Sequence, residues 1–159
     1  VDTLKMTPQM VGITFSLAGV VSIFMQAVGI RWLLKNIPNK RVLLLGSMLL
    51  SVISLIFYVG AVTVVLFTII SLVYMAFSAP QNPIVTSMIT ERTNPEDQGA
   101  VLGLNQAYIS VGQIIGPLIA GLIAGYWVPG IFIAAAVVFA LAAVALIPLF
   151  SERQKKFDF

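Results

Sequence analysis

The fold is decided by residues 42–90, which read VLLLGSMLLSVISLIFYVGAVTVVLFTIISLVYMAFSAPQNPIVTSMIT and contain no Asp, Glu, Lys or Arg. A helix that crosses the apolar core of a bilayer needs about 20 mostly apolar residues, so this stretch is long enough for two spans. Residues 58–61 (Tyr-Val-Gly-Ala) supply a turn between them, since tyrosine favours the membrane–water interface and glycine breaks helices. The stretch therefore predicts a helical hairpin inside a membrane.

Charge-free stretches of the same kind lie on both sides of this hairpin. Residues 6–30 fit one span, and residues 98–151 fit a pair divided by the turn at residues 126–130 (Tyr-Trp-Val-Pro-Gly). Charged residues make up only 9% of the chain and the mean hydropathy is +1.02, whereas soluble domains average about 25% charged residues. We predict an all-α, polytopic membrane protein: a single transmembrane domain over residues 1–159 with about five spans. The spans are expected near residues 9–30, 42–59, 62–89, 98–125 and 130–149.

The basic residues predict the orientation of these spans. If the helices cross in turn, all Lys and Arg residues except Lys5 fall on one side: Arg31, Lys35, Lys40, Arg41, Arg92, Arg153, Lys155 and Lys156. Basic loops stay in the cytoplasm, so the N-terminal end is predicted outside a cell membrane and the C-terminal end inside. The net charge of +3 is thus explained by topology, and we expect no nucleic-acid partner.

Several kinds of chemistry are missing from the sequence. It contains no cysteine and no histidine, and no predicted span contains Asp, Glu, Lys or Arg. Disulfides and thiolate metal sites are therefore excluded, together with the commonest general base. We predict no enzyme activity, no metal and no cofactor. The chain also begins with Val1 rather than Met, which suggests a fragment or a processed product.

The link after the third span is acidic. Glu91, Glu96 and Asp97 are candidates for cation binding, but solvated charges at a helix start are the favoured interpretation. Asn94 is expected to cap the fourth helix, with Pro95 at its first position.

Two spans carry prolines and glycines with structural consequences. Pro80 and Pro83 fall inside the third span, where each proline removes a backbone donor, so a kink is predicted. Broken helices form binding sites in transporters, although many kinks serve packing alone. In the fourth span, Gly112, Gly116 and Ala120 recur every four residues on one helical face, which predicts close helix packing; Pro117 adds a bend.

The run from Gly112 through Gly116-Pro117 to Gly121 resembles the glycine–proline motif of the drug:proton antiporters of the major facilitator superfamily. Residues 29–41 are similar to that family's loop between helices eight and nine, with Lys40 and Arg41 as its basic pair, although Lys35 and Pro38 depart from the pattern. Residues 94–99 and 104–106 resemble the start of helix eleven in bacterial multidrug exporters. The resemblance covers the whole chain, read as helices eight to twelve of the C-terminal half. It implies three partners: the lipid bilayer, a small-molecule substrate and a missing N-terminal half.

The resemblance also implies which residues meet the substrate. Spans one, three and four would face a central cavity, whereas spans two and five, which look bland, would lie outside it. Polar side chains at helical spacing, such as Gln106, Ser110 and Gln113, fit this assignment, although hydrogen bonds between helices would also explain them. The candidates for lining the cavity are Gln26, Tyr74, Gln81, Asn82, Asn105, Gln106, Ser110 and Gln113, and those for helix packing or gating are Pro80, Pro83, Gly112, Gly116, Pro117 and Gly121.

The predicted function is secondary active transport, with proton-coupled efflux of drugs or other lipophilic small molecules favoured. A metabolite or organic-ion permease of the same superfamily is one alternative, and a non-transporting membrane scaffold or assembly subunit is another. Ionisable groups inside a membrane usually mark proton pathways, so the coupling proton is not expected to be carried by this part of the transporter.

Overall fold

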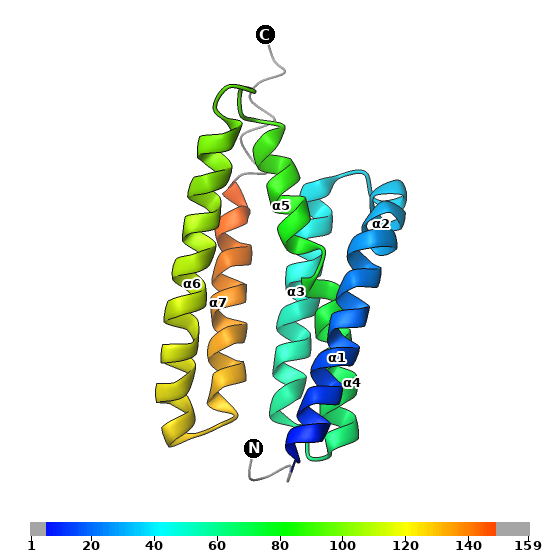
Figure 1. Ribbon diagram of the computed structural model, residues 1–159, viewed down its shortest axis with the longest axis vertical. Coiled ribbons are helices and arrows are strands. Elements are labelled where there is room, and N and C mark those ends of the chain that lie inside the picture. The colour runs from blue at the N-terminus through cyan, green and yellow to red at the C-terminus, as the bar shows by residue number, and fades with distance from the viewer. Residues whose placement is uncertain (1–5, 149–159) are drawn as a thin grey trace.

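The computed structural model describes residues 6–148, which form a bundle of helices without β-strands (Figure 1). The helices are α1 (Pro8–Phe24), the π-helical η1 (Met25–Gly29), α2 (Ile30–Asn36), α3 (Lys40–Val59), α4 (Val64–Ser78), α5 (Gln81–Thr90), α6 (Gln98–Tyr126) and α7 (Gly130–Leu146). Four helical segments are long and apolar enough to cross a membrane: Pro8–Asn36, Lys40–Val59, Val64–Thr90 and Gln98–Ala124. The predicted all-α membrane fold is confirmed, and α7, with 17 residues, is at the short end of span lengths.

The first span is longer than its sequence predicts. The helix does not stop near residue 30 but continues through η1 and α2 to Asn36. A π-helical turn lies at Met25–Gly29, and a Cβ atom on Gly29 would lie 2.8 Å from the Met25 sulfur, so a larger residue there would require the flexible Met25 side chain to move. Such turns occur often at functional sites, and this one contains Gln26.

The third span is interrupted at the predicted position. α4 ends at Ser78 and α5 begins at Gln81, with Pro80 buried at the junction. Pro80 has no N–H group to continue the α4 ladder, but its carbonyl accepts from the Ile84 N–H at 3.1 Å and so starts the next helix. Because of the break, Gln81 and Asn82 lie in the first turn of α5 instead of continuing the helical faces of α4.

α6 begins at Gln98, as the predicted span does, but its cap differs from the prediction. Asn94 does not cap this helix: residues 95–97 form a turn in which the Asp97 N–H donates to the Asn94 carbonyl at 2.9 Å, and α6 begins only at Gln98. The Gln98 side chain explains the tight link, since its Nε2 donates to the Thr90 carbonyl at 3.2 Å and so satisfies the end of α5. The connection is therefore fixed by an amide that the sequence interpretation overlooked.

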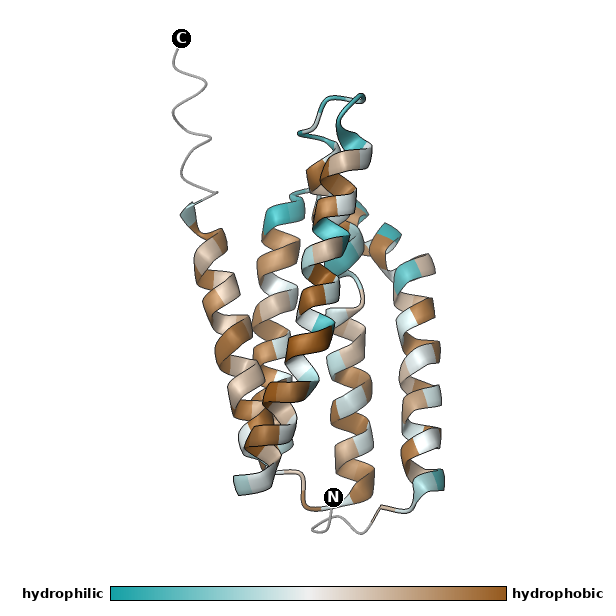
Figure 2. Cartoon of the chain, turned by 60° about the vertical axis from the view of Figure 1, so that its left-hand side comes forward, coloured by the Kyte–Doolittle hydropathy of each residue, from teal (hydrophilic) through white to brown (hydrophobic). Residues whose placement is uncertain are grey.

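The apolar core lies where α3 and α7 pack along each other and against α5. Its buried residues are Leu43, Leu44, Met48, Ile84 and Ala143. α6 stands at the edge of the bundle beside α7 (Figure 1), and none of its residues, all within the described range, is buried. Figure 2 shows polar residues gathered at one end of the bundle, in the α2–α3 and α5–α6 connections, while apolar residues dominate along the helices.

Candidate functional site

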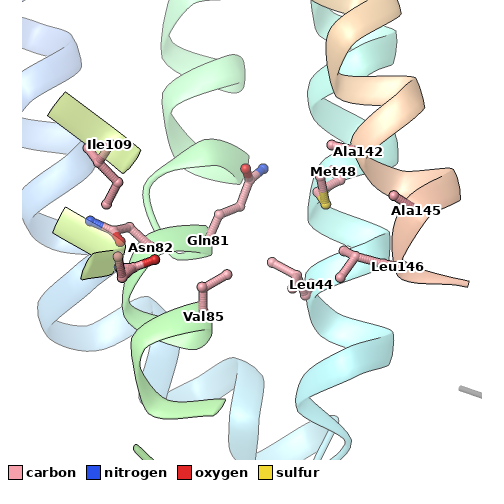
Figure 3. A pocket seen from close by; sticks show the side chains of 10 residues that line it. Leu44, Met48, Gln81, Asn82, Val85, Ile109, Ala142, Ala145 and Leu146 are labelled. Carbon is pink, nitrogen blue, oxygen red and sulfur yellow. The ribbon is translucent and has the colours of Figure 1, made fainter. Parts of the chain in front are cut away.

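The broken third span sends two neighbouring amides in different directions. Successive residues on a helix are about 100° apart, so Gln81 and Asn82 cannot share a face. Figure 3 shows Gln81 reaching toward the α3 side, whereas Asn82 is turned toward Ile109 of α6. The two predicted site residues therefore have different surroundings and different roles.

Gln81 serves as a link between helices. Its Nε2 donates to the Ser51 hydroxyl of α3 at 2.9 Å and to the Phe77 carbonyl at 3.3 Å. Ser51 is 0% exposed, and its own hydroxyl donates to the Ser47 carbonyl at 2.9 Å. For Gln81, the alternative interpretation of interhelical hydrogen bonding thus matches the geometry.

Ser51 belongs to a polar row that the sequence interpretation missed when it described the second span as bland. Ser47, Ser51 and Ser54 recur at i, i+4 and i+7 on α3, and all three are buried. The spacing was visible in the sequence, but serine in an otherwise apolar helix carries a weak signal because its hydroxyl can bond to its own helix.

Asn82 and Asn105 meet at an apolar cavity of about 590 Å³ between α3, α5, α6 and α7, which we call the α5–α6 cavity. Its apolar walls include Leu44, Met48 and Ile109, and Gln81 also lines it (Figure 3). Pockets of this size, apolar with a few polar groups, are typical of small-molecule binding sites.

Asn82 also borders a second hollow, of about 500 Å³, which we call the η1–α5 groove. Gln26 stands on its opposite wall, where its Nε2 donates to the Ser22 hydroxyl at 3.0 Å. The groove is more polar than the α5–α6 cavity because Thr86 and Thr90 of α5 also line it. Asn82 is thus common to both hollows, and Pro83 beside it lines the groove.

Tyr74 lies apart from these amides. It lines a separate apolar pocket of about 270 Å³ between α1, α3 and α4, together with Phe15, Tyr58 and Met75. Its ring also meets Phe139 of α7 edge-on, with 6.4 Å between the ring centroids. The structure therefore does not bring Tyr74 together with Gln81 and Asn82, although all three belong to the same interrupted span.

The polar row on α6 is open. Gln106 and Gln113 are exposed, and the Ser110 hydroxyl donates to the Gln106 carbonyl at 2.9 Å. Nothing described lies within 4 Å of a Cβ added at Gly112, Gly116 or Gly121, so the predicted close packing has no partner among the described residues. Pro117 lies inside the continuous α6 helix.

Charged groups meet at the polar end of the bundle. Lys40, the first residue of α3, forms an ion pair with Glu91 at the end of α5 and donates to the Ser87 hydroxyl at 2.6 Å. Glu91 is therefore an ion-pair partner rather than a cap of the next helix. The described residues contain no group of three or more acidic side chains placed to hold a metal ion.

The fold and the site are those of a polytopic membrane protein, and a span broken at a proline beside amide-bordered hollows is typical of membrane transporters. Residues 1–157 match the family profile of the Major Facilitator Superfamily, and the chain belongs to that family. The family resemblance predicted from the glycine–proline motif is thereby confirmed, and because this is a family of transporters, the prediction that the chain is not an enzyme is confirmed as well.

The chain is also similar to Multidrug resistance protein 2 of Bacillus subtilis (strain 168). The two are 32% identical over 124 residues, which cover 77% of this chain and 30% of the relative. The chain thus spans about a third of that relative's length.

Proposed function

We propose that this chain is the C-terminal part of a proton-coupled exporter that moves lipophilic small molecules out of the cell. One observation carries the proposal: Asn82, an exposed amide on a broken membrane helix, borders both the α5–α6 cavity and the η1–α5 groove. Broken helices with polar groups near mid-membrane form the binding sites of many secondary transporters.

The exposed amides need water, substrate or protein beside them. Gln26, Asn82, Gln106 and Gln113 are all exposed on helices otherwise rich in apolar residues. An amide in hydrocarbon without a partner is strongly disfavoured, so these groups are expected to face a path between two halves of the transporter rather than lipid. The second half is expected to cover the open face of α6.

The side chains that line the α5–α6 cavity indicate the chemical class of the proposed substrate. The α5–α6 cavity offers aliphatic side chains and neutral amides, without a charged residue. Such a wall suits apolar molecules and lipophilic cations better than sugars or phosphates. The similarity to a protein named for multidrug resistance supports the same class of substrate.

The proton is expected to be carried elsewhere. Charged residues in the described spans lie only near the polar end of the bundle, as Arg31, Lys35, Lys40 and Arg41 do. Because proton relays through a membrane need titratable groups within it, the acid that couples transport belongs to another part of the transporter.

The proposed orientation places the polar end of the bundle in the cytoplasm of the cell, because the basic residues cluster there. The chain has no cysteine of its own, so single cysteines can report on each side. Cysteines at Asn39 and Asn94 should react only with membrane-permeant maleimides in intact cells, and one at Gly130 should react with impermeant ones. Labelling of Asn39 by an impermeant reagent would reverse the orientation.

The function is tested with the full-length transporter in proteoliposomes. An imposed proton gradient should drive movement of a fluorescent lipophilic cation, and a proton ionophore should abolish it. Asn82→Ala should weaken the apparent affinity by about tenfold or less, the range expected for one neutral hydrogen bond. Asn36→Ala, which changes an exposed amide at the end of α2, is the control. Transport that ignores the proton gradient would refute coupling, and equal effects of the two variants would refute the assignment of Asn82.

A further inference from the structure

A basic cleft lies at the polar end of the bundle, where it adjoins the η1–α5 groove at Ser87, whose hydroxyl accepts from Lys40. It has a volume of about 490 Å³ between the α2–α3 turn and the end of α5, and its walls include Pro38, Lys40, Arg41, Met88, Glu91 and Arg92. Three cations face one acid there, so the lining carries a net charge of +2. Transport of a neutral or cationic substrate gives no reason for a cleft of this sign.

The single acid of the cleft is already engaged. Glu91 pairs with Lys40, and the Ser87 hydroxyl holds the same ammonium group. Arg92 forms no ion pair with any described residue. A guanidinium in this position can donate two parallel hydrogen bonds to phosphate oxygens, a geometry that lysine cannot provide. α3 begins at Lys40, so the positive end of its dipole adds to the attraction.

The level of the cleft along the membrane helices indicates which kind of anion would reach it. The apolar run of α3 begins at Val42, directly after the basic pair, and Pro38 and Met88 contribute apolar surface to the walls. The cleft therefore lies where membrane helices leave the hydrocarbon and lipid headgroups begin. Basic pockets between membrane helices at this level bind anionic headgroups.

We propose that this cleft binds the phosphate of an anionic membrane lipid. Arg92 is the principal contact, and Lys40 contributes less because it is ion-paired with Glu91. The ligand is a phosphodiester attached to acyl chains, which lie against the apolar sides of α3 and α5. The cleft shares no lining residue with either hollow of the proposed substrate path, so the proposal is tested by lipid-binding measurements alone.

The test uses the full-length transporter in neutral detergent micelles, titrated with fluorescent phosphatidylglycerol or phosphatidylcholine of the same chain length. Phosphatidylglycerol should bind more tightly, and added salt should weaken it. Each basic residue near a charged lipid surface contributes about fivefold in affinity, so Arg92→Gln should weaken phosphatidylglycerol binding by about that factor. Arg31→Gln is the matched control, because Arg31 is exposed on α2 at the same end of the bundle and lies outside the cleft.

A variant that gains affinity separates binding from misfolding. Glu91→Gln removes the one acid of the cleft and releases Lys40, so it should strengthen phosphatidylglycerol binding by about fivefold. A damaged protein would not bind more tightly. The proposal is overturned by equal affinity for the two lipids, by equal losses in Arg31→Gln and Arg92→Gln, or by weaker binding in Glu91→Gln. Inorganic phosphate provides a further arm: if it displaces phosphatidylglycerol at equal phosphate concentration, the site is one for soluble anions and the lipid proposal is wrong.

Discussion

α3 and α6 carry polar residues at the same helical spacing, yet the two helices have opposite surroundings. α3 has Ser47, Ser51 and Ser54, and α6 has Gln106, Ser110 and Gln113. The three serines are buried, and their hydroxyls donate to the carbonyls of Leu44, Ser47 and Leu50 at 2.8–2.9 Å. The two glutamines are exposed. Equal periodicity thus accompanies a packed face in one helix and an open face in the other.

The difference shows how the hydrogen-bonding capacity of a polar side chain limits where it can lie in a membrane helix. A serine satisfies its donor on its own helix, so it can face a tightly packed neighbour without an external partner. A glutamine has two donors and an acceptor, which its own helix cannot satisfy together. Amide rows therefore indicate a wet path or another protein surface, whereas serine rows are compatible with close packing.

The largest effect should come from filling the packed face. Ser51→Leu inserts a branched side chain where the native residue is 0% exposed, and it also removes the acceptor of the Gln81 amide. Overpacking and a lost partner together should lower the free energy of unfolding by about 2 kcal/mol or more. The measurement is unfolding of the full-length transporter in detergent, followed by circular dichroism.

Ser110→Leu is the matched control, because the Ser110 hydroxyl also bonds to its own helix at 2.9 Å. On an open face the same change should shift stability by only about 0.5 kcal/mol. If Ser110→Leu destabilises the transporter as strongly as Ser51→Leu, the polar row of α6 is packed against protein and lines no cavity.

The next effect concerns the glycine face of α6. Gly116 has open space around it in this chain, and we expect the rest of the transporter to pack there. Gly116→Leu should therefore abolish export by the full-length protein, and Gly116→Ala should be milder. Gly125→Leu is the control, since Gly125 lies on the opposite side of the same helix and is equally open. Near-normal transport by Gly116→Leu would remove the packing role.

A smaller effect is expected from the amides of α6. Gln106→Ala and Gln113→Ala should each change the apparent affinity for exported substrates by about tenfold or less, unevenly from one substrate to another. Neither group changes protonation near neutral pH, so the pH midpoint of transport should stay the same. Ile115, on the opposite side of α6 and 47% exposed, provides the control variant Ile115→Ala. Loss of proton coupling in either glutamine variant, with affinity unchanged, would contradict the proposed division of labour.

The sequence predicted the positions of the helices better than the surroundings of their side chains. Charge-free stretches of span length and the pair Pro80 and Pro83 led directly to membrane helices and to the break before α5, because lipid leaves the backbone little choice. The fourth span was expected near residues 98–125 and α6 begins at Gln98, but the predicted cap at Asn94 was wrong because a tight turn there competes with capping, and a local motif cannot decide between the two.

The residues predicted to form one site do not all lie together. Asn82 and Asn105 line one cavity, and their contact with a substrate stays a prediction. Tyr74 lies in a different pocket because the interruption at Ala79 and Pro80 separates the helical face of α4 from that of α5. In one continuous helix Tyr74 and Gln81, seven residues apart, would lie on the same face, but the break between α4 and α5 divides that face.

The smallest effect is expected from a comparison of two glutamine–serine hydrogen bonds that lie in different surroundings. The Gln81 amide donates to Ser51 between helices at 2.9 Å, and the Gln26 amide donates to Ser22 within one exposed helix segment at 3.0 Å. Hydrogen bonds between membrane helices contribute about 0.6 kcal/mol on average in double-mutant cycles. A cycle of Gln81→Ala and Ser51→Ala should give about that coupling energy, because Ser51 is buried and water cannot replace Gln81 as its partner. A cycle of Gln26→Ala and Ser22→Ala should give a coupling near zero, because water or the other half of the transporter can take either partner. Equal couplings in the two cycles would show that the packed and open faces do not differ in the way that α3 and α6 indicate.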